Sequence, residues 1–220
     1  MIEVLGRASS SNVQKVLWAL EELGLPFERR PVGGSFGGGD APDYRALNPN
    51  GLVPTFREDD FVLWESDAIL RHLARTRGQG TLMPETAEAQ ARADQWTCWA
   101  TTTLYPALAP IFFGTVRTPR AAQDLSGLDA AVEKLAATVA ILDDALSGRD
   151  WLAGAAFSYG DIAPAINARR ALKLPFGAPE APHVSAWLAR LSERPGFRRW
   201  VDVPMGTCLE EWREHESRIG

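Results

Sequence analysis

Three serines and an asparagine stand together near the N-terminus, where a short apolar run gives way to a helical pattern: Ser9, Ser10, Ser11 and Asn12. Such residues often cap helices, because their side chains accept hydrogen bonds from unpaired backbone N–H groups. A helix N-terminus also carries partial positive charge, so hydroxyl groups placed there can stabilise an anion. Four polar residues exceed what capping requires, and both interpretations stay open.

A second polar segment, residues 48–54, reads Asn-Pro-Asn-Gly-Leu-Val-Pro. Proline has no N–H, so within a sheet it is tolerated only at an edge or at the end of a strand. A cis peptide bond between Val53 and Pro54 would leave the Val53 backbone N–H and C=O for a partner other than the sheet. An ordinary turn is the alternative.

A third segment, residues 63–69, reads Leu-Trp-Glu-Ser-Asp-Ala-Ile. Ser66 is suited to capping a helix. The two neighbours Glu65 and Ser66 could also bind a ligand. Glu65 offers a carboxylate for an ammonium group, and Ser66 offers a hydroxyl and a backbone N–H for a carboxylate. The pair would therefore suit the α-amino-acid end of a small ligand.

A fourth polar pattern has a structural explanation. Ser158 and Asp161 have the spacing of a capping box that opens a helix, and we interpret Asp161 as a folding residue.

The elements that must position these residues differ between the two halves of the chain. Over residues 1–77, short apolar runs alternate with helical periodicity, which predicts an α/β domain with a mixed sheet in the order βαβαββα. The expected strands are 2–5, 27–32, 53–57 and 61–64, and the expected helices are 13–23, 43–47 and 66–74.

Residues 78–86 read as a linker, and residues 87–220 as an all-helical domain. The helices expected there are 87–113, with a kink at Pro106 or Pro110, then 132–146, 158–172 and 184–191, the last ended by Pro195 and Gly196.

Composition narrows the class of protein. The chain has 220 residues, 45% of them hydrophobic, and a net charge of −5, which disfavours a nucleic-acid partner. We expect no membrane partner, since no stretch approaches the roughly 18 apolar residues of a membrane span, and no secretory signal begins the sequence. Cys98 and Cys208 lack metal-ligand spacing. A reducing, cytoplasmic location is the simplest expectation.

The order and spacing of these motifs resemble those of the glutathione S-transferases over nearly the whole chain. Residues 9–24, with the run Lys-Val-Leu-Trp-Ala-Leu-Glu-Glu-Leu-Gly, look like bacterial members of the serine-type, theta- and nu-like branch. The resemblance implies a thioredoxin-like N-terminal domain followed by an all-helical domain. It also implies glutathione as co-substrate, no metal, a homodimer and a role in detoxification.

The resemblance further implies roles for single residues. Ser10 would stabilise the glutathione thiolate, and Asn12 would be a second donor. The residues expected to bind the rest of glutathione are Ser11, Leu52, Val53, Pro54, Glu65 and Ser66. Among them, the Val53 backbone would pair with the cysteinyl part, and Glu65 and Ser66 would hold the γ-glutamyl ammonium and carboxylate. The glycine-rich residues 33–39 would lie near the glycyl end.

The electrophile would bind against the helical domain, where the candidates for an apolar wall are Trp99, Thr103, Tyr105, Phe112 and Phe113. Core packing is the alternative role for such residues.

The function expected first is conjugation of glutathione to a small hydrophobic electrophile. The alternatives are a nu-like disulfide-bond reductase, in which glutathione supplies both sulfurs, and a non-catalytic glutathione-binding module. An isomerase is less favoured, because Asn12 stands where zeta-type isomerases carry Cys. Position 11 is Ser where nu-like members have Pro, so the subclass stays open.

Overall fold

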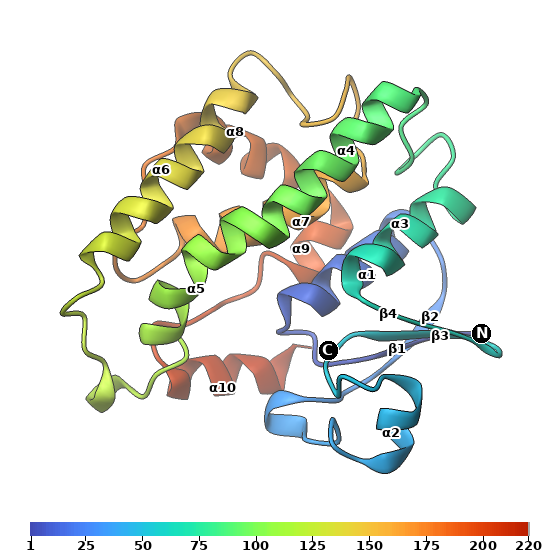
Figure 1. Ribbon diagram of the computed structural model, residues 1–220, viewed down its shortest axis with the longest axis horizontal. Helices are drawn as coiled ribbons and strands as arrows, with labels where there is room; N and C mark the ends of the chain where they lie inside the picture. Colours follow the sequence, from blue (N-terminus) through green and yellow to red (C-terminus); the bar gives the residue numbers. More distant parts are fainter. Residues whose placement is uncertain (220) are drawn as a thin grey trace.

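The N-terminal half is built on a four-stranded sheet, as expected of a thioredoxin-like domain (Figure 1). The computed structural model describes residues 1–219. Its strands are β1 (Ile2–Leu5), β2 (Phe27–Arg30), β3 (Thr55–Glu58) and β4 (Phe61–Trp64). The helices between and after them are α1 (Ser11–Glu22), the 3-10 turn η1 (Gly34–Phe36), α2 (Pro42–Leu47) and α3 (Ser66–Arg77).

The sheet is mixed, as the sequence predicts. Its strand order is β2-β1-β3-β4, with β1 parallel to β2 and antiparallel to β3, and with β3 antiparallel to β4. Successive side chains of a strand point to opposite faces. Accordingly, Val4 belongs to the main core beside α1 and α3, whereas Leu5 packs with Val32 and with Tyr44 of α2 on the other face.

Helix α1 lies between the sheet and the helical half. Nine of its 12 residues are buried, and it contacts α3, α7 and α9. Its Trp18 is fully buried, with its ring centroid 5.6 Å from that of Phe157 and 5.2 Å from that of Phe197. Since α1 is covered on all sides, packing decides its stability and holds its N-terminus in a defined place.

The second half is entirely helical in the described residues and forms the left and upper part of Figure 1. Its long helices are α4 (Ala87–Trp99), α5 (Tyr105–Gly114), α6 (Asp129–Leu146), α7 (Tyr159–Leu172), α8 (Pro182–Leu191) and α10 (Leu209–Arg218). Shorter helical segments are η2 (Ala100–Leu104), η3 (Arg120–Ala122) and α9 (Pro195–Trp200). None of the helices in residues 1–219 has the length and apolar character needed to cross a bilayer.

The helix expected over residues 87–113 is interrupted at a different place. The π-helical turn η2 separates α4 from α5 and comes just before Pro106. Proline in a helix removes one N–H and crowds the carbonyl four residues earlier, which here belongs to Thr102 inside η2. The wider turn of η2 accommodates that lost bond.

Other sequence expectations need correction at the ends of elements. Ser66 does not cap α3, because it is the first helical residue and Glu65 occupies the cap position. Pro195 begins the short helix α9, where proline is tolerated because the first N–H groups of a helix are unpaired. The sequence does not predict helix α10, because most of its residues are charged. Three bounds also differ from those expected. Strand β2 ends at Arg30 instead of residue 32, strand β3 begins at Thr55 instead of residue 53, and helix α3 extends to Arg77 instead of residue 74.

The capping box at the start of α7 is confirmed. Asp161 is fully buried, and its carboxylate accepts hydrogen bonds from the backbone N–H groups of Leu152 and Ser158, each at 3.0 Å. Trp187 Nε1 of α8 donates to the same carboxylate at 3.3 Å. Asp161 therefore joins the loop after α6 to α7 and α8.

We predict that Asp161→Asn lowers the free energy of unfolding by about 1–3 kcal/mol, because its amide nitrogen cannot accept from buried donors. Burial raises the pKa of Asp161 to about 6 from 3.8, so the folded chain binds this proton more tightly than the unfolded chain does. The contribution of the carboxyl group to stability therefore falls as pH rises from about 4 to about 6.

Denaturant unfolding at pH 5 and pH 7 measures the loss of unfolding free energy and its dependence on pH. The loss caused by Asp161→Asn should be larger at pH 5 than at pH 7. The control is Asp150→Asn, which changes an exposed carboxylate paired with Arg190. Equal unfolding free energies for the Asp161 and Asp150 variants would contradict the assigned role.

Candidate functional site

Three of the polar segments singled out in the sequence converge at the start of α1. Gly6, at the end of β1, permits this approach, because a Cβ there would lie 2.5 Å from a methyl group of Val13 and 3.2 Å from Val53 Cβ. Lys15 of α1 hydrogen-bonds to Ser66 at the start of α3. The loop at Val53 and the N-termini of α1 and α3 thus form one corner of the molecule.

The start of α1 leaves its hydrogen-bonding groups uncapped. Ser10 occupies the N-cap position with extended backbone, yet its side chain makes no capping hydrogen bond. Ser10 and Ser11 are each 9% exposed, whereas Asn12 is exposed. The structural interpretation of Ser10 as a side-chain cap is therefore wrong. Within residues 1–219, no hydrogen bond uses its hydroxyl or the first N–H groups of the helix, so these groups can act on a group outside the helix.

The loop that contains Val53 is held by a hydrogen-bonded cluster beneath it. Tyr44 Oη donates to the Leu52 carbonyl at 2.6 Å, and Asn48 Nδ2 donates to the same carbonyl at 2.9 Å. Thr55 Oγ1 lies 2.9 Å from Tyr44 Oη. Burial raises the pKa of Tyr44, which keeps its hydroxyl protonated as a donor. Sequence reasoning missed this supporting role of Asn48 and Tyr44.

The Val53–Pro54 peptide bond is cis, as expected from the sequence. Strand β3 begins only at Thr55, and no hydrogen bond within residues 1–219 uses the Val53 N–H or C=O. These backbone groups can therefore pair with an extended peptide ligand, as in β-strand addition. Leu52 beside them is 69% exposed.

Glu65 and Ser66 lie at the junction of β4 and α3. Glu65 has a φ of 73°, a left-handed conformation that costs a non-glycine residue about 1–3 kcal/mol and is concentrated at functional sites. Glu65 is exposed, and Ser66 is 5% exposed. The unpaired N–H groups in the first turn of α3 surround Ser66, so this helix start can hold a carboxylate.

The five candidates for an electrophile wall fall into separate groups. Trp99 packs edge to face on Trp96, with 5.2 Å between ring centroids. Phe112 is buried and contacts Phe113 and Trp212. Trp99 is the last residue of α4, whereas Phe112 lies near the end of α5, beyond the intervening turn η2. No ring contact in the described chain connects them.

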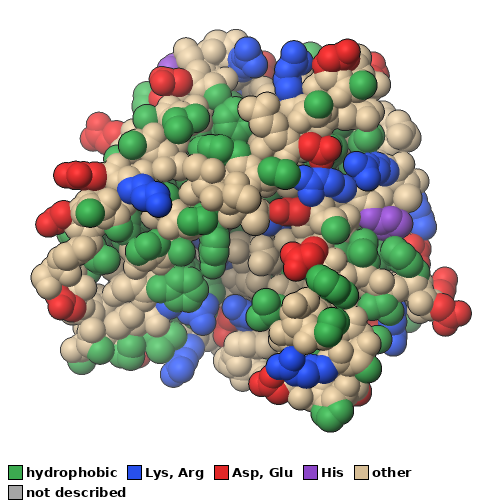
Figure 2. All heavy atoms as spheres, viewed as in Figure 1, with side chains coloured by type: hydrophobic (Ala, Val, Ile, Leu, Met, Phe, Trp, Pro, Cys, Tyr) green, Lys and Arg blue, Asp and Glu red, His purple; other side chains and the backbone are tan. Residues whose placement is uncertain are grey.

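The two remaining candidates differ in exposure, since Thr103 is partly buried and Tyr105 is 37% exposed. Phe113 is 48% exposed. Figure 2 shows the surface hollowed where the helical half meets the N-terminal half, between the α5 and α10 region and the α2 loop.

A buried carboxylate that sequence reasoning missed ties α10 to the site. Glu216 is 4% exposed and accepts hydrogen bonds from the hydroxyl groups of Ser9 and Ser35. Arg7 Nε lies 3.3 Å from Glu216 Oε1. One side chain of α10 thus holds the loop before α1 and the glycine-rich loop together. The sequence signal that could have indicated the burial of Glu216 is Trp212, which lies four residues earlier and on the same buried helix face.

Arg117 acts on the same carboxylate, and Arg170 contacts the loop before α1. Although burial opposes ionisation of Glu216, bonds from Ser35 and Ser9 and the charges of Arg7 and Arg117 hold its pKa below its usual range. Arg170 of α7 is also buried and donates to the Ser9 carbonyl at 2.7 Å and to Gln14 Oε1 at 3.0 Å.

Burial and the neighbouring Arg169 lower the pKa of Arg170 to about 9. The start of α1 is therefore held from two sides of the helical half, by Arg170 and by Glu216. No group of three or more metal-ligating side chains occurs within residues 1–219.

Comparisons with known proteins give a consistent result. Residues 9–76 match the family model "Glutathione S-transferase, N-terminal domain", and residues 104–195 match "Glutathione S-transferase, C-terminal domain". Glutathione S-transferase GstB of Escherichia coli is 40% identical over 93% of this chain and 100% of its own length. Glutathione S-transferase 3 of Zea mays is 33% identical over 91% of this chain and 93% of its own.

A solved structure is also similar throughout. The theta class glutathione S-transferase of Xanthomonas axonopodis pv. citri, with glutathione bound, superposes with a TM-score of 0.88. It is 41% identical and covers 93% of this chain and 99% of its own.

We predict that Glu216→Gln loosens α10, because the hydrogen bonds from Ser9 and Ser35 lose their charged acceptor and the arginines lose their counter-ion. The free energy of opening α10 should fall by about 1.5–3 kcal/mol. Since the pKa of Glu216 is lowered in the folded chain, its contribution is present at neutral pH and is lost only on acidification.

Amide hydrogen exchange of α10 at pH 7 measures this effect. Glu214→Gln is the matched control, because Glu214 is 57% exposed and its carboxylate pairs with Arg218 one turn away. Unchanged exchange in the Glu216 variant would contradict the role assigned to this carboxylate.

Proposed function

The chain belongs to the glutathione S-transferase family, and we propose that it uses the start of α1 to activate the thiol of glutathione for attack on a small hydrophobic electrophile. Ser10 is the principal donor to the thiolate, and Asn12 is a second donor. The uncapped Ser10 hydroxyl at the head of a buried helix is the observation that carries this proposal.

Glutathione lies across the corner formed by the three segments. Its cysteinyl backbone pairs with the N–H and C=O of Val53, beside Pro54 and the exposed Leu52. Its γ-glutamyl end is bound at Glu65 and Ser66. The γ-glutamyl carboxylate binds at Ser66 and the start of α3, and the γ-glutamyl ammonium group pairs with the Glu65 carboxylate. Ser11 contributes to the same site.

The magnitudes are sufficient for thiol activation. A thiol with a pKa of about 8.5 is only about 3% thiolate at pH 7. Lowering that pKa by about 2 units requires about 2.7 kcal/mol of preferential stabilisation of the anion. A hydrogen bond to a charged acceptor supplies about 1.5–3 kcal/mol, and a helix N-terminus adds about 0.3–1 kcal/mol. Ser10, Asn12 and α1 therefore suffice without a buried base.

The electrophile side belongs to the helical domain, which we place at residues 87–220 after a glutathione-binding domain of residues 1–77. Of the expected wall residues, Tyr105 and Phe113 are exposed enough to meet a ligand, whereas Phe112 packs in the core. Residues 78–86 connect the two domains as a linker, in which Leu82 and Met83 are buried.

We place the protein in the cytoplasm. Cys98 and Cys208 are free thiols, and Cys98 is exposed. Exposed thiols persist in a reducing compartment, which also supplies glutathione.

We predict that Ser10→Ala raises the pKa of the thiol of bound glutathione by about 1–2 units, because one hydrogen bond to the thiolate is lost. Conjugation of glutathione to an aromatic halide should then fall about 10-fold at pH 7 and recover as the pH is raised. The affinity for glutathione should change little. The pH dependence of kcat/KM measures the shift.

Ser126→Ala is the control, because it removes an exposed serine in the loop before α6. If Ser10→Ala kept the wild-type pH profile while Asn12→Ala abolished activity, Asn12 would be the principal donor. If the wild-type chain bound to immobilised glutathione but conjugated none of several electrophiles, the proposed activity would be contradicted.

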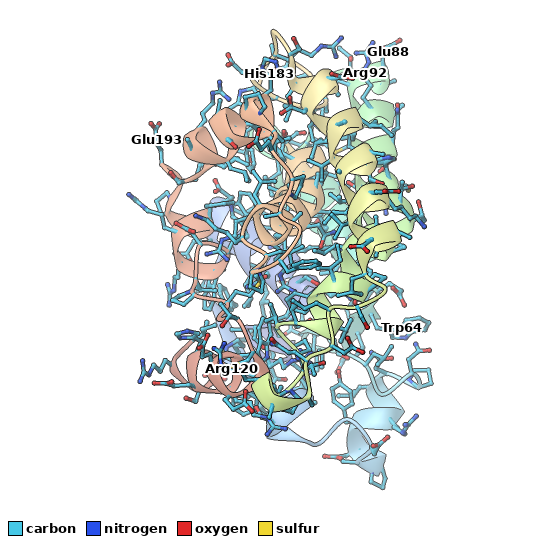
Figure 3. All side chains as sticks on the ribbon, turned by 90° about the vertical axis from the view of Figure 1, so that its left-hand side faces the viewer. Trp64, Glu88, Arg92, Arg120, His183 and Glu193 are labelled. Atoms are coloured by element: carbon cyan, nitrogen blue, oxygen red, sulfur yellow. The ribbon has the colours of Figure 1, made fainter. Side chains whose placement is uncertain are left out.

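We also predict a homodimer, with a sedimentation mass near twice 24.1 kDa. Phe61 and Trp64 of β4 are 45% and 38% exposed, and burying them against a second copy is favourable. Figure 3 shows Trp64 at the edge of the molecule, on the same side as Arg92 of α4. The exposed faces of α3 and α4 complete the expected interface.

Trp64→Glu should shift the mass towards that of the monomer. The control is Phe36→Glu, which changes an exposed aromatic residue of the glycine-rich loop. A wild-type mass of 24 kDa would refute the dimer.

A further inference from the structure

A buried lysine lies beneath the start of α3. Lys15 is in the second turn of α1, and its side chain is 3% exposed. Its ammonium nitrogen lies 2.7 Å from Asp67 Oδ1, 3.3 Å from Ser66 Oγ and 3.4 Å from Thr101 Oγ1 of η2. The ammonium group has three N–H donors, so each donor has one partner.

The direction of the bond to Ser66 has a consequence for the serine. An ammonium group can only donate, so Ser66 Oγ must be the acceptor in this bond. The hydroxyl hydrogen of Ser66 is therefore left to donate to a different group. A hydroxyl held in this way, with positive charge behind it, is prepared to donate to an anion.

Lys15 also compensates a negative charge beside the same site. Asp67 follows Ser66 directly, its side chain is 18% exposed, and its second oxygen accepts from Thr101 Oγ1 at 2.7 Å. Without the ammonium group, this carboxylate would repel a ligand carboxylate bound at Ser66. A pair between Lys15 and Asp67 alone would stabilise the fold, but it would not require the contact with Ser66.

We propose that Lys15 is a positioning residue for the γ-glutamyl carboxylate of glutathione: it orients the Ser66 hydroxyl towards that carboxylate and neutralises Asp67. Lys15 acts from beneath the subsite and does not touch the ligand. This inference rests on the proposed binding of glutathione at Ser66.

The test compares two peptides by calorimetry. One is glutathione, and the other is 4-aminobutanoyl-cysteinylglycine, which keeps the γ-glutamyl amino group but lacks its carboxylate. Lys15→Met keeps much of the apolar stem and removes the charge. We expect it to weaken glutathione binding about 10-fold, to leave binding of the analogue unchanged, and to raise KM for glutathione with kcat at saturation retained. Lys134→Met, on the exposed face of α6, is the control.

A second pair of variants covers the case in which Lys15→Met fails to fold because Asp67 is left unpaired. Asp67→Asn is compared with the double variant Lys15→Met/Asp67→Asn, which contains neither charge. The double variant should bind glutathione at least about 5-fold more weakly than Asp67→Asn alone, and the two should bind the analogue equally.

The outcomes separate the two proposals. If the wild-type chain bound both peptides equally, the placement of the γ-glutamyl carboxylate at Ser66 would be wrong. If the wild-type chain preferred glutathione and the Lys15 variants kept that preference, or lost affinity for both peptides alike, the role of Lys15 would be overturned and the glutathione site would stand.

Discussion

The unpaired hydrogen-bonding groups at the head of α1 are the constraint on which the rest of the structure depends. A helix start that faces solvent is easily satisfied by water or by its own side chains. Here Ser10 does not cap the helix, although it stands at the cap position. The donors therefore remain available to an anion, provided that the surrounding chain holds the helix start in place without consuming them.

Both halves of the molecule contribute to holding it. Trp18 packs between Phe157 and Phe197, so α1 is as much a part of the helical core as of the sheet domain. Arg170 reaches from α7 to the Ser9 carbonyl, and Glu216 reaches from α10 to the Ser9 hydroxyl. The helical half thus holds the loop before α1 in place, although that loop belongs to the N-terminal half.

Buried polar groups act in the same way at each segment of the site. Asn48 and Tyr44 converge on the Leu52 carbonyl, which leaves the Val53 backbone unused. Lys15 supports Ser66 from below. Burying such groups is costly unless their hydrogen bonds are made, so each cluster admits few alternative arrangements. The resulting rigidity is what binding sites need for preorganised donors.

The sequence alone determined the mixed sheet, the helical second half and the capping box, because these follow from local periodicity and turn residues. The order of its motifs also carried the resemblance to the family. The sequence also singled out Ser10, Val53 and Ser66 as site candidates. Only the tertiary structure decided that Ser10 leaves its helix uncapped, and it alone revealed Lys15 and Glu216. Their partners lie 51 and 207 residues away, and no local pattern encodes a contact at that separation.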